Sequence, residues 1–431
     1  MVIEQLYDIY LDHPEVTTDS RKVKKDTLFF ALRGENFNGN IFAGEALEKG
    51  ASYVVVDQKD LPQKPGFIFV EDVLETLQKL AAMHRRSFDI PFIALTGSNG
   101  KTTTKELLQA VLSQEYKTHA TKGNLNNHIG VPLTLLETPR DTEVAVIEMG
   151  ANHLDEIHFL CRIAQPTHGL VTNVGKAHLE GFGSFEGVQK GKSELYAYLA
   201  EHRGGVFVQG DNPYLGKMLA NRKASSNIIA SYGTHFNNNI VGEASKTGPY
   251  LEVIWKNTDV RIKTQLTGSY NLDNVLASIC VGNYFKISTR KIKEGIEGYF
   301  PANQRSQIIQ TEKNTIIADY YNANPSSMQA ALDNFKLLQA KNKVIILGDM
   351  FELGEDSSDE HQKIIEKALL LQAHRLILVG KNFKSNDSHQ GEFYETAEEA
   401  KTVLNESPIT NSTVLMKGSR GVALENLIEI L

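Results

Sequence analysis

The stretch FIALTGSNGKTTTKELL, from Phe92 to Leu108, decides the fold of the middle of this chain. An apolar run leads into a glycine-rich turn, and the turn leads into a segment of helical character. The common phosphate-binding pattern G-x-x-x-x-G-K-[ST] requires a glycine at position 95, where this chain has Leu95. The first glycine comes two positions later, so the loop is a contracted variant of that pattern.

The residues of this turn predict a site for ATP. A turn between a strand and a helix presents backbone N–H groups to an anion at the positive end of the helix dipole. A lysine after the second glycine can reach the β- and γ-phosphates, and the next hydroxyl is placed for Mg²⁺. The alternative is a glycine turn with a solvated lysine, but the strand, the helix and the G-K-T triplet favour nucleotide. The predicted loop residues are Gly97, Ser98, Asn99, Gly100, Lys101, Thr102 and Thr103.

Buried strands alternate with helices around this loop. The runs VAVIEMG (144–150), HGLVTNVG (168–175) and GGVFVQGD (204–211) are almost wholly apolar and end in Gly or Asp. Such runs are typical of a parallel sheet covered on both faces, with ligands bound beyond the carboxyl ends of the strands. Residues 250–268 predict a β-hairpin. We therefore predict a central P-loop-type ATPase domain, residues 87–300, with a mostly parallel sheet.

Two breaks divide the chain into three α/β domains. Short β-like runs at 27–32, 52–57 and 66–72, followed by a helical stretch to Arg86, predict a small N-terminal domain, residues 1–86. After GYFPANQRSQ (298–307) the alternation restarts and ends in a closing helix, which predicts a Rossmann-like C-terminal domain, residues 301–431. A length of 431 residues suits several hydrophobic cores.

The composition argues against several classes of protein. A formal charge of −7 is unfavourable for a nucleic-acid-binding protein. No apolar run approaches the ~20 residues of a membrane span, and the N-terminus lacks the features of a signal peptide. Cys161 and Cys280 lie in apolar stretches and are expected to be free, buried thiols. We expect a cytoplasmic, monomeric protein without nucleic-acid partners or membrane insertion.

Polar residues after the central strands could complete a magnesium–nucleotide site. Glu148 ends a buried strand, where an unpaired carboxylate is costly, and Mg²⁺ prefers oxygen ligands. His178 follows the neighbouring strand and could be a ligand or a charge partner. A helix-capping or salt-bridged Glu148 and a structural His178 remain the alternatives.

Lys190 and Lys192, in GVQKGKSELY, are expected at the start of a helix, where the dipole disfavours cations. One interpretation is a solvated pair whose apolar stems lie on the surface. The other is that at least one lysine faces the phosphates or has been chemically altered so that it is no longer a cation.

The C-terminal domain supplies further polar groups. Asp319 ends a strand, and the turn NANP (322–325) leads into a helix that we expect Ser326 or Ser327 to cap. Arg305 arrives from a separate domain and could complete charge neutralisation at a γ-phosphate.

The chain resembles the Mur ligases of peptidoglycan synthesis over essentially its whole length. The resemblance is carried in order by GSNGKTTTKE, GNLNNHIGVPLTLL, EMGANHLDEI, TNVGKAHLEGFGSFEGVQKGKSELY, YNLDNVLASI, NQRSQ, DYYNANPSSMQAAL, ILGDMFELGEDS and KGSRG. TTDSRKVKKDTLFFALRGENFNG (17–39) is similar to the family's N-terminal domain. The family has a UDP-sugar-binding domain, a central ATPase and a Rossmann-like domain for the incoming amino compound, in agreement with the two breaks.

The resemblance implies roles for individual residues. Magnesium, two ions in all, would involve Thr102, Glu148, His178 and Lys192, and Lys192 matches a lysine that the family carries as a carbamate. The catalytic residues would be Lys101, Lys192, His178 and Arg305. The other implied contacts are Ser20 and Arg21 with the UDP moiety, Asn271 and Asn274 with adenine, Arg305 with the γ-phosphate, and Asp319 with the ribose. One departure is Tyr270, where the family often has histidine.

Within the family, the resemblance implies the activity that joins D-alanyl-D-alanine to a UDP-N-acetylmuramoyl tripeptide through an acyl phosphate. We expect Asn322 and Asn324 to position the dipeptide, because their turn carries no charge. The preceding ligase, which adds a diamino acid, typically has D-N-P-R at this turn. Folylpolyglutamate synthase would lack the TDSR-containing domain, and a P-loop NTPase that does not ligate is the rival from another class.

Overall fold

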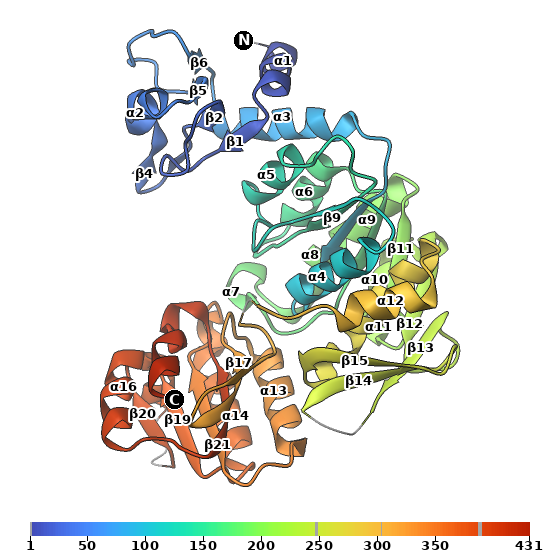
Figure 1. Cartoon of the computed structure of the whole chain (residues 1–431), viewed down its shortest axis with the longest axis vertical. Helices are drawn as coiled ribbons and strands as arrows, with labels where there is room; N and C mark the ends of the chain where they lie inside the picture. The colour runs from blue at the N-terminus through green and yellow to red at the C-terminus, as the bar shows by residue number, and fades with distance from the viewer. Residues whose placement is uncertain (1, 246–248, 303, 387–389) are drawn as a thin grey trace.

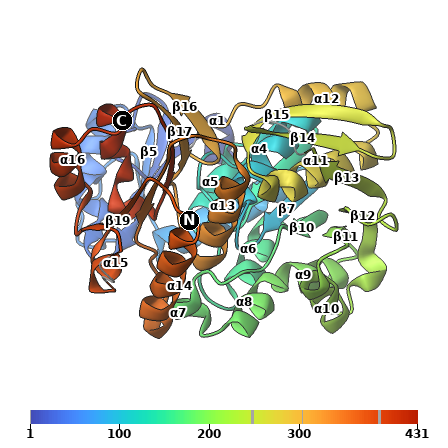
Figure 2. The same cartoon turned by 90° about the horizontal axis from the view of Figure 1, so that it is seen from below.

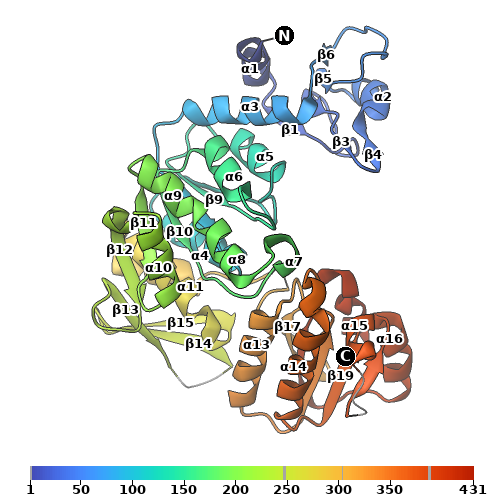
Figure 3. The same ribbon diagram turned by 180° about the vertical axis from the view of Figure 1, so that it is seen from behind.

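The computed structural model describes residues 2–245, 249–302, 304–386 and 390–431. The chain forms three α/β domains, each built on its own sheet, with the central domain between the other two (Figure 1). The view from behind shows the same order, with the N-terminal and C-terminal domains at opposite ends (Figure 3). The predicted fold class is confirmed.

The N-terminal domain contains a four-stranded parallel sheet in the order β1-β2-β5-β6. The three predicted strands are confirmed as β2, β5 and β6, while the short β1 and the β3–β4 hairpin were not predicted. The elements are α1 (Ile3–Asp12), β1 (Glu15–Thr17), β2 (Thr27–Phe30), β3 (Arg33–Gly34), β4 (Phe37–Asn38), α2 (Ala43–Glu48), β5 (Tyr53–Val56), β6 (Phe67–Phe69) and α3 (Val73–Arg86).

Helix α3 joins the N-terminal domain to the central one. The side chain of Arg85 donates hydrogen bonds to the carbonyls of Ala164 (2.9 Å) and Gln165 (2.8 Å), at the C-terminal end of a central helix. A cation is favourable at that end of a helix dipole. The hydroxyl of Tyr10 donates to the carbonyl of Leu136 (2.6 Å). Apolar residues of both domains form one continuous core here, so the boundary at residue 86 stays a prediction.

The central sheet has nine strands in the order β15-β14-β13-β12-β11-β10-β7-β9-β8. It is parallel from β8 to β13, and the predicted hairpin β14–β15 adds antiparallel strands at one edge. The strands are β7 (Phe92–Thr96), β8 (Thr118–Ala120), β9 (Val144–Glu148), β10 (His168–Val171), β11 (Gly205–Gln209), β12 (Ile228–Gly233), β13 (Ile240–Ala244), β14 (Tyr250–Trp255) and β15 (Val260–Thr267).

Helices cover both faces of this sheet (Figures 1 and 3). Their bounds are α4 (Lys101–Leu112), α5 (Gly130–Leu136), α6 (Glu156–Ala164), α7 (Leu179–Phe182), α8 (Phe185–Lys192), α9 (Glu194–Glu201), α10 (Pro213–Asn221), α11 (Leu272–Tyr284) and α12 (Thr289–Glu297).

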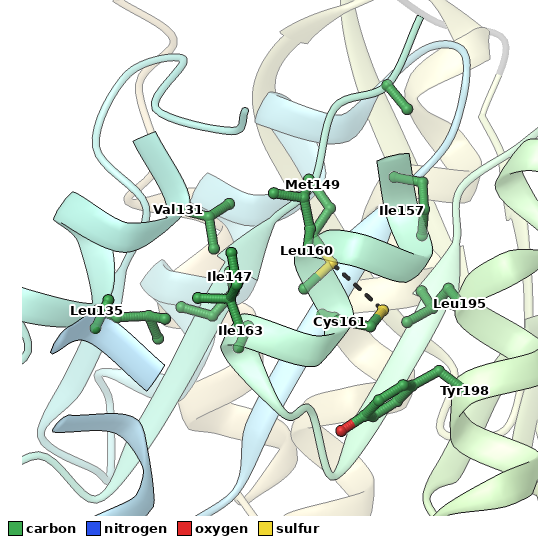
Figure 4. Packing of buried hydrophobic residues seen from close by; sticks show 14 of the residues in the cluster. Val131, Leu135, Ile147, Met149, Ile157, Leu160, Cys161, Ile163, Leu195 and Tyr198 are labelled. Carbon is green, nitrogen blue, oxygen red and sulfur yellow. Dashed lines mark hydrogen bonds between the residues drawn. The ribbon is translucent and has the colours of Figure 1, made fainter. Parts of the chain in front are cut away.

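Alternate residues of the central strands enter different cores. In β7, Phe92 and Ala94 pack on the face that carries α5 and α6, whereas Ile93 and Leu95 pack on the face that carries α4 and α11. Strands buried on both faces lose the polar alternation of a half-exposed sheet, which is why they read as continuous apolar runs. Figure 4 shows part of the first core, where Cys161 Sγ lies 3.8 Å from the sulfur of Met149.

The C-terminal domain has a six-stranded sheet in the order β16-β17-β21-β18-β19-β20, parallel except for β16. The predicted closing helix is instead two 3₁₀ segments, η5 (Arg420–Val422) and η6 (Leu424–Ile430). The other elements are β16 (Gln307–Gln310), β17 (Asn314–Asp319), α13 (Pro325–Leu337), β18 (Lys343–Gly348), α14 (Ser357–Leu369), β19 (Arg375–Val379), α15 (Lys381–Ser385), β20 (Glu392–Tyr394), α16 (Ala397–Glu406) and β21 (Ser412–Lys417).

Two expectations about the whole chain can be checked directly. Cys161 and Cys280 are both buried and free, as predicted. Within the described part of the chain, every helix is too short or too polar to cross a bilayer.

Candidate active site

A cavity of about 650 Å³ lies between the central and C-terminal domains. Its central wall is formed by the loop after β7, the end of β9 and the start of α11. Its other wall is formed by the end of β17 and the start of α13. The predicted phosphate loop therefore faces the C-terminal domain across one shared cavity. Seen from below, α13 and α14 lie on the side of the molecule toward the viewer, with α7 beside them (Figure 2).

The phosphate loop requires glycine at Gly97 and Gly100. Both have positive φ, +147° and +78°. A Cβ at Gly97 would lie 2.0 Å from the hydroxyl oxygen of Thr172, and a Cβ at Gly100 would lie 2.5 Å from Asn274 Oδ1. The Thr172 hydroxyl donates to the carbonyl of Asn99 (2.7 Å), so β10 fixes the loop from the adjacent strand. The contracted glycine spacing thus still produces a strand–loop–helix turn with open backbone N–H groups.

Gly97→Ala is expected to lower the melting temperature by several degrees, because its Cβ collides with Thr172 in a backbone conformation that L-residues rarely adopt. Gly216→Ala is the matched control. Gly216 lies inside α10, no atom would come within 4 Å of the new Cβ, and alanine favours the helix by up to ~1 kcal/mol. Thermal unfolding of both variants tests the difference, and equal melting temperatures would contradict it.

Three predicted residues converge at the loop. Lys101 begins α4, and its ammonium folds back onto the carbonyls of Gly97 (2.7 Å) and Ser98 (3.5 Å). The hydroxyl of Thr102 donates to Glu148 Oε1 at 3.3 Å. Burial lowers the pKa of Lys101, the charge of Glu148 opposes this effect, and Arg305 lowers the pKa further.

Glu148 is held with one oxygen free. The side-chain amide of Asn126 donates to Oε1 (2.8 Å), and Oε2 is buried without a hydrogen-bond partner among the described residues. A buried carboxylate oxygen without a partner is costly unless a ligand pairs with it. The Glu148–Thr102 pair is therefore the part of this cavity that fits an oxygen-preferring divalent cation. The described residues include no group of three or more His, Cys, Asp or Glu side chains placed to hold a metal.

The predicted position of the two lysines in their helix was wrong. Lys190 and Lys192 lie in the last turn of α8, where the dipole favours cations, because the helix already begins at Phe185 with Ser184 as its N-cap. Lys190 is exposed, but Lys192 is 1% exposed, and its ammonium donates to the carbonyl of Ala151 (2.9 Å). Lys192 is thus behind the cavity wall that Ala151 lines.

The charge on Lys192 is disfavoured. Burial and the nearby charge of Lys101 lower the pKa of Lys192 well below that of an ordinary lysine, with Glu156 and Glu194 opposing the shift. A lysine paired with an acid on the surface would need a nearby carboxylate such as Glu194, but Glu194 forms no ion pair with Lys192 in the described structure. It accepts hydrogen bonds from the backbone N–H groups of Asp155 (2.7 Å) and His158 (3.0 Å) at the start of α6.

His178 lines the same cavity but contacts the other domain. Its Nδ1 is hydrogen-bonded to the carboxylate of Glu352, which follows β18. This bond lowers the pKa of the Glu352 carboxyl. Nearby, Lys176 forms an ion pair of 2.7 Å with the buried Glu360 of α14. The segment after β10 is therefore a contact between the two domains.

Arg305, Asp319 and Tyr321 form the C-terminal wall of the cavity. The guanidinium of Arg305 lies 3.9 Å from the ring centroid of Tyr321, and its Nε has no hydrogen-bond partner among the described residues. Asp319 accepts from Lys417 at 2.7 Å and from the backbone N–H of Ser306 at 3.2 Å.

Asn99 links the phosphate loop to the predicted acceptor turn. Its Oδ1 accepts from Asn324 (2.8 Å), and its Nδ2 donates to Ser326 (3.3 Å). The predicted cap of α13 was wrong: Asn324, not a serine, is the N-cap and forms a capping box with Ser327. The Ser326 hydroxyl donates to the capping Asn324 Oδ1 (3.0 Å) while it accepts from Asn99, so it lies between the cap and the loop.

The predicted adenine residues are buried and bonded to one another. Asn274 donates to Asn271 Oδ1 (2.8 Å), and Asn271 donates to the carbonyl of Thr267 (2.7 Å) and to Ser306 (3.0 Å). The hydroxyl of Tyr270 also contacts Ser306 (3.0 Å). Burial raises the pKa of the Tyr270 hydroxyl well above its ordinary value, so it remains a neutral group in the wall.

Two predicted residues lie elsewhere. Ser20 and Arg21 belong to the N-terminal domain and do not line this cavity, and the exposed Arg21 pairs with Asp19 at 2.9 Å. The residues that sequence reasoning missed are mainly partners from across a domain or a strand. They are Asn126, Asn173, Tyr321, Glu352, Glu360 and Lys417. All of them except Glu360 lie in the stretches quoted for the family resemblance, which was a usable signal, but none was singled out there.

Three family models match successive parts of the chain. They are the Mur ligase family catalytic domain at residues 14–85, the Mur ligase middle domain at 95–282, and the Mur ligase glutamate ligase domain at 304–420. The matches follow the three sheets in order, while the boundaries proposed at 86/87 and 300/301 stay predictions.

Relatives of known function match over nearly the full length. UDP-N-acetylmuramoyl-tripeptide–D-alanyl-D-alanine ligase of Bacillus subtilis is 33% identical over 96% of this chain and 92% of its own. A crystal structure of MurF from Acinetobacter baumannii has a TM-score of 0.85 and 29% identity, covering 96% of this chain and 92% of that one. MurF from Thermotoga maritima in complex with ADP has a TM-score of 0.84 and 26% identity, with 96% coverage of each chain. This chain belongs to the Mur ligase family.

Proposed function

We propose that this protein joins D-alanyl-D-alanine to a UDP-N-acetylmuramoyl tripeptide, with ATP converted to ADP and phosphate, in the synthesis of peptidoglycan precursors. The observation that carries the proposal is the cavity between the two domains, where a phosphate loop and an uncharged acceptor turn face each other. The full-length relatives with this activity support the same conclusion.

The reaction has two chemical steps. The terminal carboxylate of the tripeptide attacks the γ-phosphorus of ATP, which forms an acyl phosphate and releases ADP. The amine of the dipeptide then attacks the acyl carbon, loses a proton, and expels phosphate from a tetrahedral intermediate. Both steps move negative charge on phosphoryl oxygens, and positioned cations lower the barrier to such steps.

The residues of this chain supply those cations from two domains. Lys101 and the N–H groups of the loop lie on the central side, and Arg305 lies on the C-terminal side with its Nε unpaired among the described residues. Lys101 must leave the carbonyls of Gly97 and Ser98 to bind phosphate. Burial lowers the pKa of Lys101, and the negative charge of the bound phosphate would raise this pKa again and so favour the ammonium form. Bringing both cations to one phosphate requires the domains to be held together, as the Asn99–Asn324 bond does.

Magnesium is proposed as the metal, with Thr102 and Glu148 as its protein ligands. The free buried oxygen of Glu148 and the adjacent hydroxyl fit a hard cation. When bound, the ion would polarise the phosphoryl oxygens and offset their charge. His178 is proposed for a second ion, for which it would have to exchange its bond to Glu352.

Lys192 is proposed to carry a carbamate. Carbon dioxide adds to the unprotonated amine, a C–N bond forms, and one proton is released to solvent. Burial and the charge of Lys101 favour the unprotonated amine that this addition needs. The product is an anion whose oxygens suit magnesium. Glu156 and Glu194 oppose a negative charge at this place, so Lys101 and the metal would have to outweigh them.

The remaining substrate contacts are proposals of the same kind. Asn271 and Asn274 would shape the base pocket through their own hydrogen bonds, and Asp319 would meet the ribose beside its partner Lys417. Ser20 and Arg21 would meet the UDP moiety, at a distance from the cavity that the long UDP-peptide has to span. One chain supplies both walls of the cavity, which supports a monomer as the active form.

The acceptor distinguishes this activity from that of the preceding ligase. D-alanyl-D-alanine is expected to exceed meso-diaminopimelate and L-lysine in kcat/KM, because the turn around Asn322 and Asn324 has no charged side chain for a second carboxylate or amine. Steady-state rates with each acceptor, at saturating ATP and UDP-tripeptide, measure the preference. A diamino acid that proved the better acceptor, with the UDP-dipeptide as co-substrate, would move the assignment to the preceding ligase.

A further inference from the structure

We propose that Arg420 binds the terminal carboxylate of the incoming dipeptide and so makes the enzyme specific for an acceptor with a free C-terminus; this inference rests on the proposed function. D-alanyl-D-alanine presents an amine, two methyl groups and one carboxylate. The acceptor turn itself has no cation, so the carboxylate needs one from another part of the C-terminal domain.

Two other loops of the C-terminal domain, those after β18 and β21, meet at that turn. Ser419 ties them together: its hydroxyl donates to the carbonyl of Ala323 (3.5 Å) and accepts from the N–H of Phe351 (3.3 Å). Its own N–H donates to the carbonyl of Asp349 (3.1 Å). The backbone of Arg420 is therefore fixed next to the acceptor turn, at the carboxyl ends of β17, β18 and β21, where open α/β sheets bind ligands.

Among the described residues, Arg420 is a cation at this place with no anionic partner and no role assigned above. Within the described ranges its guanidinium makes no hydrogen bond or ion pair, and its side chain is exposed. Lys417 is already used, since its ammonium donates to Asp319 Oδ2 (2.7 Å) and to the carbonyls of Asp319 and Asn322 (3.3 Å each). Arg305 is assigned to the γ-phosphate. A guanidinium matches a carboxylate with two parallel hydrogen bonds, which an ammonium cannot do.

Arg305 and Arg420 are brought to the same aromatic ring beside the acceptor turn. Arg305 and Arg420 both lie over the ring of Tyr321, with guanidinium carbons 3.9 Å and 5.7 Å from its centroid. Tyr321 lines the cavity. The dipeptide, roughly 7 Å long when extended, would lie along this ring, with its amine toward the phosphate side near Arg305 and its carboxylate at Arg420. Tyr321 and the partly exposed Phe351 offer apolar surface to the two methyl groups.

Arg420→Ala and the acceptor D-alanyl-D-alaninamide, which lacks the terminal carboxylate, together test the proposal. With the wild-type enzyme, the amide should have kcat/KM roughly 10–100-fold below that of the dipeptide, because it cannot form the charge-assisted pair. In Arg420→Ala the KM for the dipeptide should rise by a similar factor, and the two acceptors should become nearly equal. The KM values for ATP and the UDP-tripeptide should not change. Arg420→Lys should recover part of the loss.

Arg290→Ala is the matched control, since Arg290 is an exposed arginine of α12 that does not line the cavity. Melting temperatures of all variants establish that they fold, which is expected because the Arg420 side chain has no polar partner to lose among the residues that the structure describes. The proposal is overturned if Arg420→Ala keeps the wild-type KM for the dipeptide or still rejects the amide as strongly. A wild-type enzyme that released no phosphate with the dipeptide would instead refute the proposed function itself.

Discussion

Lys101→Ala is expected to lower kcat by about 10²–10³ while the protein stays folded. The loss is large because Lys101 is the one cation inside the loop that faces the cavity, where phosphoryl charge must be held during both chemical steps. Stability should change little, because within the described part of the chain the ammonium bonds only to two carbonyls of its own loop and is partly desolvated. Rates of phosphate release, with thermal unfolding of the same samples, measure both effects.

Lys117→Ala is a suitable control for Lys101→Ala. Lys117 is exposed, pairs with Asp141 at 2.9 Å, and lies outside the cavity, so its loss should leave the rate unchanged. Near-normal ligation by a folded Lys101→Ala enzyme would exclude this loop as the ATP site.

Lys192→Ala is expected to abolish most of the activity, and short-chain carboxylates such as acetate are expected to restore part of it. The proposed carbamate places an anion where alanine leaves space, and a small carboxylate can occupy that space with its two oxygens. A structural lysine would show no rescue, because acetate cannot replace an ammonium that donates to Ala151. Intact-protein mass under non-acidic conditions and a high-resolution map of the native enzyme give readouts independent of the rate.

Lys190→Ala separates the two lysines of α8. Lys190 is exposed and its side chain is not in the cavity, so its variant should keep the wild-type rate and be insensitive to acetate. An unmodified ammonium at Lys192 with nucleotide and magnesium bound, or full activity in Lys192→Ala, would contradict the carbamate.

Local sequence patterns predicted the buried strands of the central sheet and the phosphate loop. The apolar runs of β7, β9, β10 and β11 are visible in the sequence because each is buried on both faces, and the phosphate loop follows from its glycines and the G-K-T triplet. The errors were also local in origin. The start of α8 was misplaced because the capping role of Ser184 was overlooked, and the cap of α13 was assigned to a serine although Asn324 precedes it.

The partners of the site residues could not be predicted, because they depend on how the domains meet. Glu352 reaches His178, Glu360 reaches Lys176, and Asn324 reaches Asn99 across more than 170 residues of chain in each case. No periodicity encodes such pairs. The burial of Lys192 is a similar case, since it depends on the packing of α8 against the loop that carries Ala151.

The most direct test of the account is phosphate release from ATP with the two proposed substrates supplied separately and together. The account predicts release only when both the UDP-N-acetylmuramoyl tripeptide and D-alanyl-D-alanine are present, with one UDP-muramoyl pentapeptide detected by mass for each phosphate. Steady release with ATP alone, or with equal rates whether or not the dipeptide is present, would contradict it and indicate an NTPase that does not ligate.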